Sequence, residues 1–175
     1  MTETPFPATT ATERADRIAI EHPYVLAAAS FDHRGEFAIA VVPELYACAV
    51  EIREHLWQAM GADAPTLVAL VDELPDGDEA LSDAVSVLDD GVLSRYVEAG
   101  GETERLLQRI VAECVEADRV GVLDDFIDLG GDSLSVVKVS ALIRARLGAD
   151  LSLEAVFDAS TVRDLALLVE QAKRG

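Results

Sequence analysis

Residues 126–134 read Phe126-Ile127-Asp128-Leu129-Gly130-Gly131-Asp132-Ser133-Leu134 and mark the change from a loop to a helix. Gly130 and Gly131 allow a tight backbone turn, because glycine adopts conformations that other residues avoid. Apolar residues then recur at helical spacing as far as Leu147, and Gly148 is a typical residue for ending a helix. The stretch predicts a helix from Ser133 to about Leu147, with the Ser133 hydroxyl accessible at its start.

Three more helices are predicted around this one. A broad apolar stripe before the loop indicates a first helix and consists of Leu106, Leu107, Ile110, Val111, Cys114 and Val115. A short helix is expected at residues 153–157, and Thr161 with Asp164 resembles a capping box that starts the last helix. Residues 101–175 are therefore predicted to form a four-helix bundle with one long connection between its first and second helices.

The first part of the chain alternates between helical and strand-like patterns. The predicted elements are a helix at 12–21, strands at 24–31 and 36–42 around the turn Asp32-His33-Arg34-Gly35, a helix at 44–60 and a strand at 66–71. After a flexible N-terminus, residues 1–11, we expect an α-β-β-α-β domain over residues 12–75. The whole chain is then of the α+β class.

Residues 76–100 are predicted to be an acidic linker between the two domains. Eight carboxylates and no Lys or Arg occur between Asp72 and Asp90, and their mutual repulsion favours an exposed segment. Leu81, Val85, Val87 and Leu88 can nevertheless support a short helix against a neighbour.

Composition argues against several classes of function. The formal charge of −19 does not suit nucleic acid or anionic lipid, since both require clustered Lys and Arg. Residues 1–11 lack the basic start and apolar run of a signal peptide. Cys48 and Cys114 have no Cys or His at metal-ligand spacing, so we interpret them as buried thiols and predict no metal site. We expect no nucleic-acid partner, no membrane partner and a cytoplasmic location.

The stretch at 126–134 resembles the peptidyl carrier (thiolation) domains of nonribosomal peptide synthetases. The resemblance covers about residues 104–172 and includes Asp124-Asp125-Phe126, Leu151-Ser152-Leu153 and Ser160-Thr161-Val162. It implies that Ser133, flanked by Asp132 and Leu134, is the attachment point for a 4′-phosphopantetheine arm from coenzyme A. The arm would hold an aminoacyl or acyl group as a thioester.

The physical chemistry of Ser133 agrees with that role. A phosphate at a helix N-terminus meets unpaired N–H groups and a favourable field of roughly 0.3–1 kcal/mol. No His follows Cys114, so no nearby general base makes Ser133 a hydrolase nucleophile, and we expect no catalytic residue. The plainer alternative is that Ser133 is only a helix N-cap.

The resemblance also implies the partners. A phosphopantetheinyl transferase, using coenzyme A and magnesium, would attach the arm, and a separate adenylation enzyme would load its thiol. Downstream condensation, tailoring or thioesterase enzymes would then act on the cargo. Leu134, Lys138 and Phe157 are the predicted partner contacts.

Residues 12–75 resemble the small C-terminal subdomain of adenylation domains. The similarity runs through His22-Pro23-Tyr24-Val25, Ala40-Val41-Val42-Pro43 and Leu74-Pro75. In that family a catalytic lysine follows a Pro-Asn-Gly-type turn, whereas this chain has Pro75-Asp76-Gly77-Asp78-Glu79. Its only lysines, Lys138 and Lys173, lie in the carrier part. We therefore predict that this subdomain does not catalyse adenylation.

These observations lead to one hypothesis and two alternatives. The chain is expected to be a free-standing peptidyl carrier protein, not an enzyme, whose adenylation-like N-terminal domain serves partner recognition. In the first alternative, the N-terminal part complements a separate adenylating enzyme in trans. In the second, the carrier serves polyketide or fatty acyl cargo.

Overall fold

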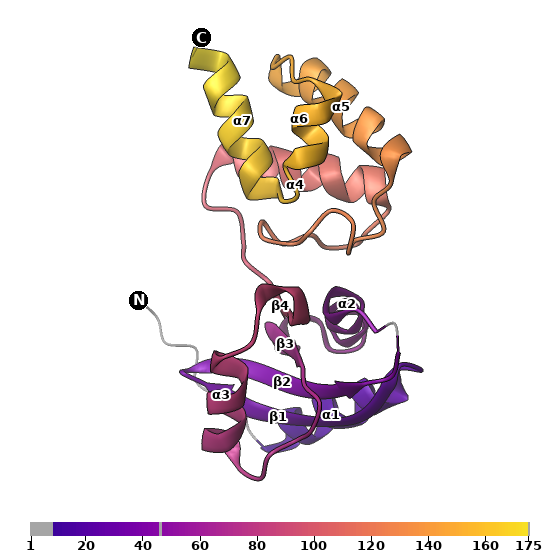
Figure 1. Cartoon of the computed structure of the whole chain (residues 1–175), viewed down its shortest axis with the longest axis vertical. Helices are drawn as coiled ribbons and strands as arrows, with labels where there is room; N and C mark the ends of the chain where they lie inside the picture. The colour runs from indigo at the N-terminus through magenta and orange to yellow at the C-terminus, as the bar shows by residue number, and fades with distance from the viewer. Residues whose placement is uncertain (1–8, 46, 175) are drawn as a thin grey trace. The chain divides into compact units, whose positions relative to one another are not determined.

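The computed structural model describes residues 9–45 and 47–174, and the chain divides into two compact units at the Arg95–Tyr96 junction (Figure 1). Helices and a four-stranded sheet are both present, so the predicted α+β class is confirmed. Residues 1–8 of the predicted flexible N-terminus lie outside the described residues, and residues 9–11 already belong to the first helix.

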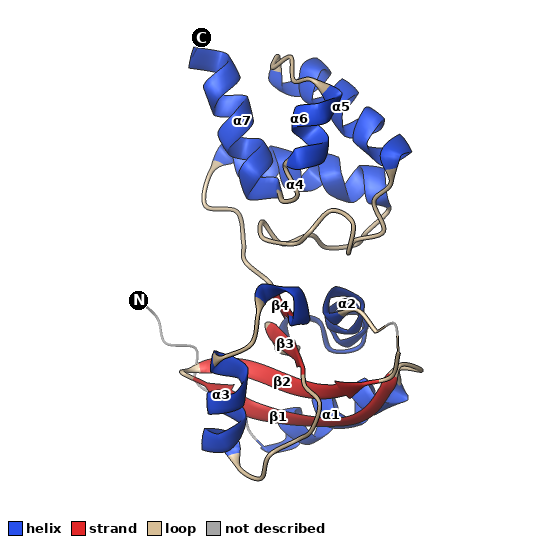
Figure 2. Ribbon diagram, in the orientation of Figure 1, coloured by secondary structure: helices blue, strands red, loops and turns tan. Residues whose placement is uncertain are grey.

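The first unit is a sheet with helices on both faces (Figure 2). Its main elements are α1 (Thr9–Glu21), β1 (Val25–His33), β2 (Glu36–Pro43), α2 (Ala49–Met60), β3 (Leu67–Leu70), α3 (Asp78–Ser86) and β4 (Leu93–Arg95). The strand order is β1-β2-β3-β4, with β2 and β3 parallel and both outer pairs antiparallel. Helix α2 begins at Ala49, later than the predicted residue 44.

The hairpin of β1 and β2 closes through a two-residue turn. Arg34 and Gly35 both have positive φ, 56° and 86°, and the Gly35 N–H donates to Asp32 Oδ1 at 2.8 Å. Two successive left-handed residues give a turn whose twist matches that of antiparallel strands. The pair His33 and Glu36 is thereby brought into register at the end of the hairpin.

Strand β2 is the centre of the first unit because it is buried on both faces. Ile39 and Val41 pack in one cluster with side chains of α1 and α2. Ala38 and Ala40 point to the opposite face, where they pack in a second cluster that includes α3. Burial on both faces explains why β2 is apolar without interruption from Phe37 to Pro43.

The prediction that residues 76–100 form a linker is wrong. Residues 78–86 form α3 and residues 93–95 form β4, which pairs with β3 from Leu93 to Arg95. Leu81 and Val85, one helical turn apart, are each only 3% exposed. Asp78 and Glu79 lie in the first turn of α3, where the helix dipole favours negative charge. Three of the eight carboxylates, Asp78, Glu79 and Asp83, thus lie on the exposed face of an amphipathic helix.

The second unit is built from helices. They are α4 (Glu102–Val115), α5 (Ser133–Leu147), α6 (Leu153–Asp158) and α7 (Val162–Arg174). All four contribute to a single core, which includes Leu107, Val139, Val156 and Val169. Gly148 ends α5 in the left-handed conformation, with φ 66°, as the sequence predicts.

The side chain of Cys114 is buried, and that of Cys48 is half-buried. Burial raises the pKa of the Cys114 thiol. Within residues 9–45 and 47–174, no helix combines the length and apolar character needed to cross a membrane.

Candidate functional site

Ser133 is the first residue of α5, and its side chain is exposed. The residue before it, Asp132, has the extended backbone of an N-cap, and its Oδ1 accepts hydrogen bonds from the Ser135 N–H at 2.8 Å and the Ser135 hydroxyl at 2.9 Å. The alternative in which Ser133 is the N-cap is therefore wrong. Because Asp132 caps the helix, the Ser133 hydroxyl is not required for that purpose.

The capping carboxylate is held in its ionised form. The hydrogen bond from the Ser135 backbone, then that from the Ser135 hydroxyl, lowers the pKa of Asp132, and the charge of Lys138 adds to the effect. A lowered pKa means that the cap is complete above the ordinary pKa of an aspartate, about 3.9, and is lost as the pH falls through the lower pKa of the folded state. The start of α5 is thus fully formed at neutral pH.

The loop before Ser133 depends on a close approach between Gly131 and Phe126. The Gly131 N–H donates to the Phe126 carbonyl at 2.9 Å, and a Cβ on Gly131 would lie 2.3 Å from Cε1 of the Phe126 ring. Gly130 adopts φ +83°, a conformation that favours glycine. Position 131 therefore requires glycine because a side chain would clash, and position 130 favours glycine because of its backbone conformation.

The same loop is fastened to the segment that precedes α7. The Phe126 N–H donates to the Ser160 carbonyl at 2.8 Å, and Asp125 forms an isolated antiparallel bridge with Thr161. The Asp164 N–H donates to Thr161 Oγ1 at 3.2 Å, which is one half of the predicted capping box, and the Thr161 hydroxyl donates to Asp164 Oδ2 at 2.7 Å. The position of Ser133 is thus tied to the fourth helix of the bundle as well as to α5.

Aspartates organise the rest of this loop from within. Oδ1 of Asp125 accepts the Ile127 N–H at 2.8 Å, and the buried Asp124 accepts the Gly121 N–H at 2.6 Å. Desolvation, followed by the charges of Asp125 and Asp124, raises the pKa of Asp128. The long connection between α4 and α5 is therefore ordered by hydrogen bonds within the loop.

The predicted partner contacts are all exposed. Leu134 on α5 is 62% exposed, Phe157 on α6 is 59% exposed, and Lys138 lies one turn after Leu134. Arg144 and Arg146, the other cations of α5, pair with Asp150 and Glu113. Because α5 contains no Asp or Glu, its exposed surface combines apolar side chains with positive charge.

Sequence reasoning missed other exposed apolar residues near the site. Val137 on α5 and Leu153 on α6 are 47% and 51% exposed and were not among the predicted partner contacts. Leu123 and Ile127, in the loop before Ser133, are 44% and 57% exposed. Their only signal in the sequence is that they are apolar residues within a loop rich in Asp and Gly. In the described part of the chain no three His, Cys, Asp or Glu side chains gather as a metal-binding group.

Residues 105–169 match the family described as the phosphopantetheine attachment site. A solved nonribosomal PCP domain is 36% identical, with 41% of this chain and 92% of that chain covered and a TM-score of 0.37. The second unit is a peptidyl carrier domain of the nonribosomal peptide synthetase type. The cofactor that this family attaches is 4′-phosphopantetheine.

Two large synthetases are among the relatives of this chain. Surfactin synthase subunit 1 of Bacillus subtilis is 35% identical over 130 residues, which cover 71% of this chain and 4% of the synthetase. The isonitrile lipopeptide synthase of Mycobacterium tuberculosis is 34% identical over 126 residues, which cover 70% and 5%. The chain therefore matches only a small part of the length of either relative.

The contact of Gly131 with Phe126 generates a prediction for the carrier domain. Gly131→Ala should lower its free energy of unfolding by about 1–3 kcal/mol, because the added methyl group forces the loop or the Phe126 ring to move. Gly101→Ala is the control, since a Cβ there meets no atom within 4 Å. Urea denaturation followed by far-UV circular dichroism measures both. An equal cost for the two variants would contradict the close approach.

Proposed function

We propose that Ser133 receives the 4′-phosphopantetheine arm and that the arm holds an aminoacyl or acyl group as a thioester. The observation that carries the proposal is that Ser133 is exposed as the first residue of α5 while Asp132 caps the helix. Its hydroxyl is thus available to another enzyme without loss of the cap. The surrounding loop is ordered, so the hydroxyl is presented in a defined place.

The chemistry required of this chain is limited to supplying an oxygen nucleophile. Ser133 Oγ forms the new phosphodiester bond to the pantetheine phosphate of coenzyme A, and the bond to the adenosine bisphosphate leaving group breaks. The proton of the hydroxyl passes to the transferase, since no His follows Cys114 in this chain. When bound, the arm supplies a terminal thiol for thioester formation. The N–H groups at the start of α5 favour the phosphate charge beside them.

The exposed surface near Ser133 supports a role in partner binding. Leu134 and Phe157 offer apolar side chains, which lose contact with water on docking. Lys138 offers a positive charge that steers carboxylates of a partner toward α5. We assign these contacts to the phosphopantetheinyl transferase, a separate adenylation enzyme, and downstream condensation, tailoring or thioesterase enzymes.

The first unit is proposed to be an adenylation-like domain that serves partner recognition and not catalysis. The match to surfactin synthase subunit 1 is longer than the second unit, so it extends into residues before Tyr96. No lysine occurs before Lys138, and the turn at Pro75 to Gly77 leads into Asp78 and Glu79. These exposed carboxylates repel the phosphates of ATP where the resembling family has a lysine.

Mass spectrometry tests the attachment site. After incubation with coenzyme A, magnesium and a broad-range phosphopantetheinyl transferase, the intact protein should gain the mass of one phosphopantetheine. Ser133→Ala should gain none, because the accepting oxygen is gone. Ser152→Ala, which alters another serine at the start of a helix, is the control and should be modified like the wild type. An adduct on Ser133→Ala, or none on a folded wild type, would refute the assignment.

Pyrophosphate exchange tests the proposed lack of catalysis in the first unit. The chain alone is incubated with ATP, magnesium and a panel of amino and carboxylic acids. It should give no exchange above the buffer, because the first unit has no lysine to stabilise the reacting carboxylate and phosphate. The same chain added to a separate adenylating enzyme should leave its exchange rate unchanged. A rate that rises with the amount of the chain would favour complementation in trans instead.

A further inference from the structure

Residues 96–101, which we call the strap, join β4 to α4, and residues 96–100 were predicted to belong to a linker. Their contacts show that they are held on the carrier domain. The guanidinium carbon of Arg119 lies 3.2 Å from the centre of the Tyr96 ring. The Val97 carbonyl accepts the Val122 N–H at 2.9 Å, and Val97 and Ala99 pack against the core of the bundle.

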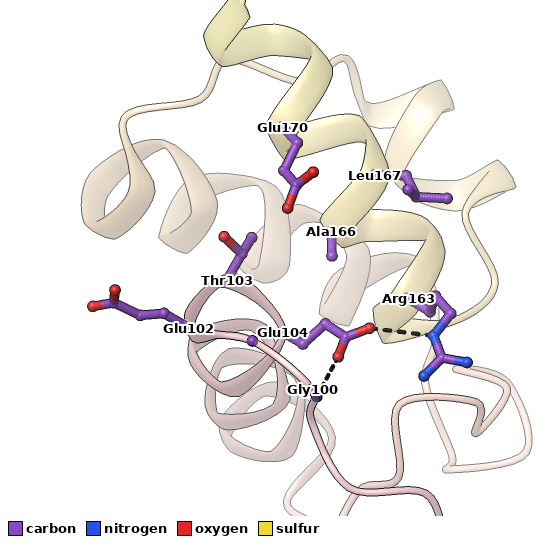
Figure 3. A pocket seen from close by; sticks show the side chains of 9 residues that line it. Gly100, Glu102, Thr103, Glu104, Arg163, Ala166, Leu167 and Glu170 are labelled. Atoms are coloured by element: carbon purple, nitrogen blue, oxygen red, sulfur yellow. Dashed lines mark hydrogen bonds and ion pairs between the residues drawn. The ribbon is translucent and has the colours of Figure 1, made fainter.

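Glu104 fastens the other end of the strap. One oxygen of its carboxylate accepts the Gly100 N–H at 2.6 Å, and the other accepts Arg163 Nε of α7 at 3.2 Å (Figure 3). The Gly100 N–H is the largest cause that lowers the pKa of Glu104. Glu104 is therefore charged at neutral pH and joins the strap, α4 and α7.

The strap is also connected to α7 through a second residue. While the Val122 N–H donates to Val97, the Val122 carbonyl accepts the Arg163 N–H at 3.0 Å. Arg163 is thus linked to both ends of the strap. Its backbone N–H bonds Val122, which bonds Val97, and its side chain bonds Glu104, which bonds Gly100. This shared residue gives a physical reason for the two ends of the strap to dock together.

On the other side of the Arg95–Tyr96 junction the chain is equally well fixed, but to the first unit. Arg95 pairs with Leu67 of β3, and Arg95 Nε lies 3.0 Å from Glu36 Oε2. The buried Ser94 accepts a hydrogen bond of 2.9 Å from Nη1 of Arg53, whose side chain is 1% exposed. Residues 93–95 and 96–101 are therefore committed to different units.

We propose that the strap is a releasable part of the carrier domain that sets the length of the tether between the two units. While it is docked, motion between the units is confined to the Arg95–Tyr96 junction. When it is released as far as Gly101, the N-cap of α4, five more residues become extensible and add up to about 17 Å of reach, at roughly 3.3–3.6 Å per residue. A carrier that delivers cargo to several enzymes needs such a change of reach.

The contacts of the strap favour release without unfolding. Glu98 and Gly100 are exposed, and apart from the carbonyl of Gly101, which accepts the Arg105 N–H as the N-cap of α4, the strap's hydrogen bonds and the Tyr96 contact lie outside the backbone ladders of helices and strands. Opening at such places costs less than global unfolding, because the helices and the core stay intact. The proposal does not depend on modification of Ser133, so it can fail while the carrier function stands.

Amide hydrogen exchange of the full chain, followed by NMR, tests the strap with Glu104→Gln. This variant keeps the size of the side chain but loses the charge that holds Gly100 and Arg163. We expect exchange at least about tenfold faster at the amides of both Gly100 and Val122, because the strap opens as one unit. Glu102→Gln, an exposed glutamate of the same helical turn, is the matched control and should exchange like the wild type.

A second variant tests the strap from its opposite end. Arg119→Gln removes the cation over Tyr96 and should also speed exchange at Gly100, although Gly100 contacts Glu104 and not Arg119. The amide of Val139 in the core should stay protected in every variant, which excludes general unfolding. Faster exchange only at the altered end, or full exchange of Gly100 in the wild type at the rate of a free peptide, would overturn the proposal.

Discussion

The close approach of Gly131 to Phe126 is the constraint on which the site depends. A side chain at Gly131 would overlap the Phe126 ring, so the backbone can pass this point only as glycine. The Phe126 N–H in turn donates a hydrogen bond to the Ser160 carbonyl, just before α7. The loop is therefore closed against the bundle before it reaches Asp132, and α5 can begin with an exposed Ser133.

The two units present different features. The carrier domain has the exposed Ser133 hydroxyl at the start of a capped helix and exposed apolar side chains beside Lys138. The first unit is bound together by β2, whose two faces hold α1 and α2 on one side and α3 on the other. Along the chain, residues 93–95 are fixed to the first unit and residues 96–101 to the carrier domain, so the boundary between the units falls at the Arg95–Tyr96 bond.

Local rules explain what the sequence predicted well. Features that depend only on neighbouring residues can be predicted from the sequence. They include the start of α5 at Ser133, its end at Gly148 and the hydrogen-bonded pair of Thr161 and Asp164. The choice of Asp132 over Ser133 as N-cap was not, because both residue types can cap. The segment of α3 was assigned to a linker because its carboxylates favour exposure. Leu81 and Val85 indicated that a short helix was possible there, but their burial depends on a sheet formed by distant residues. Exposure of Val137 and Leu153 likewise depends on tertiary packing.

The central claim is that Ser133 stands on a preformed, rigid platform and needs no rearrangement to accept the arm. A comparison of the amide NMR spectra of the unmodified and the pantetheinylated chain tests it most directly. We predict chemical-shift changes confined to residues 130–137, with the amides of the bundle core, such as Leu107 and Val169, unchanged. Changes that spread through the core, or none around Ser133, would contradict it.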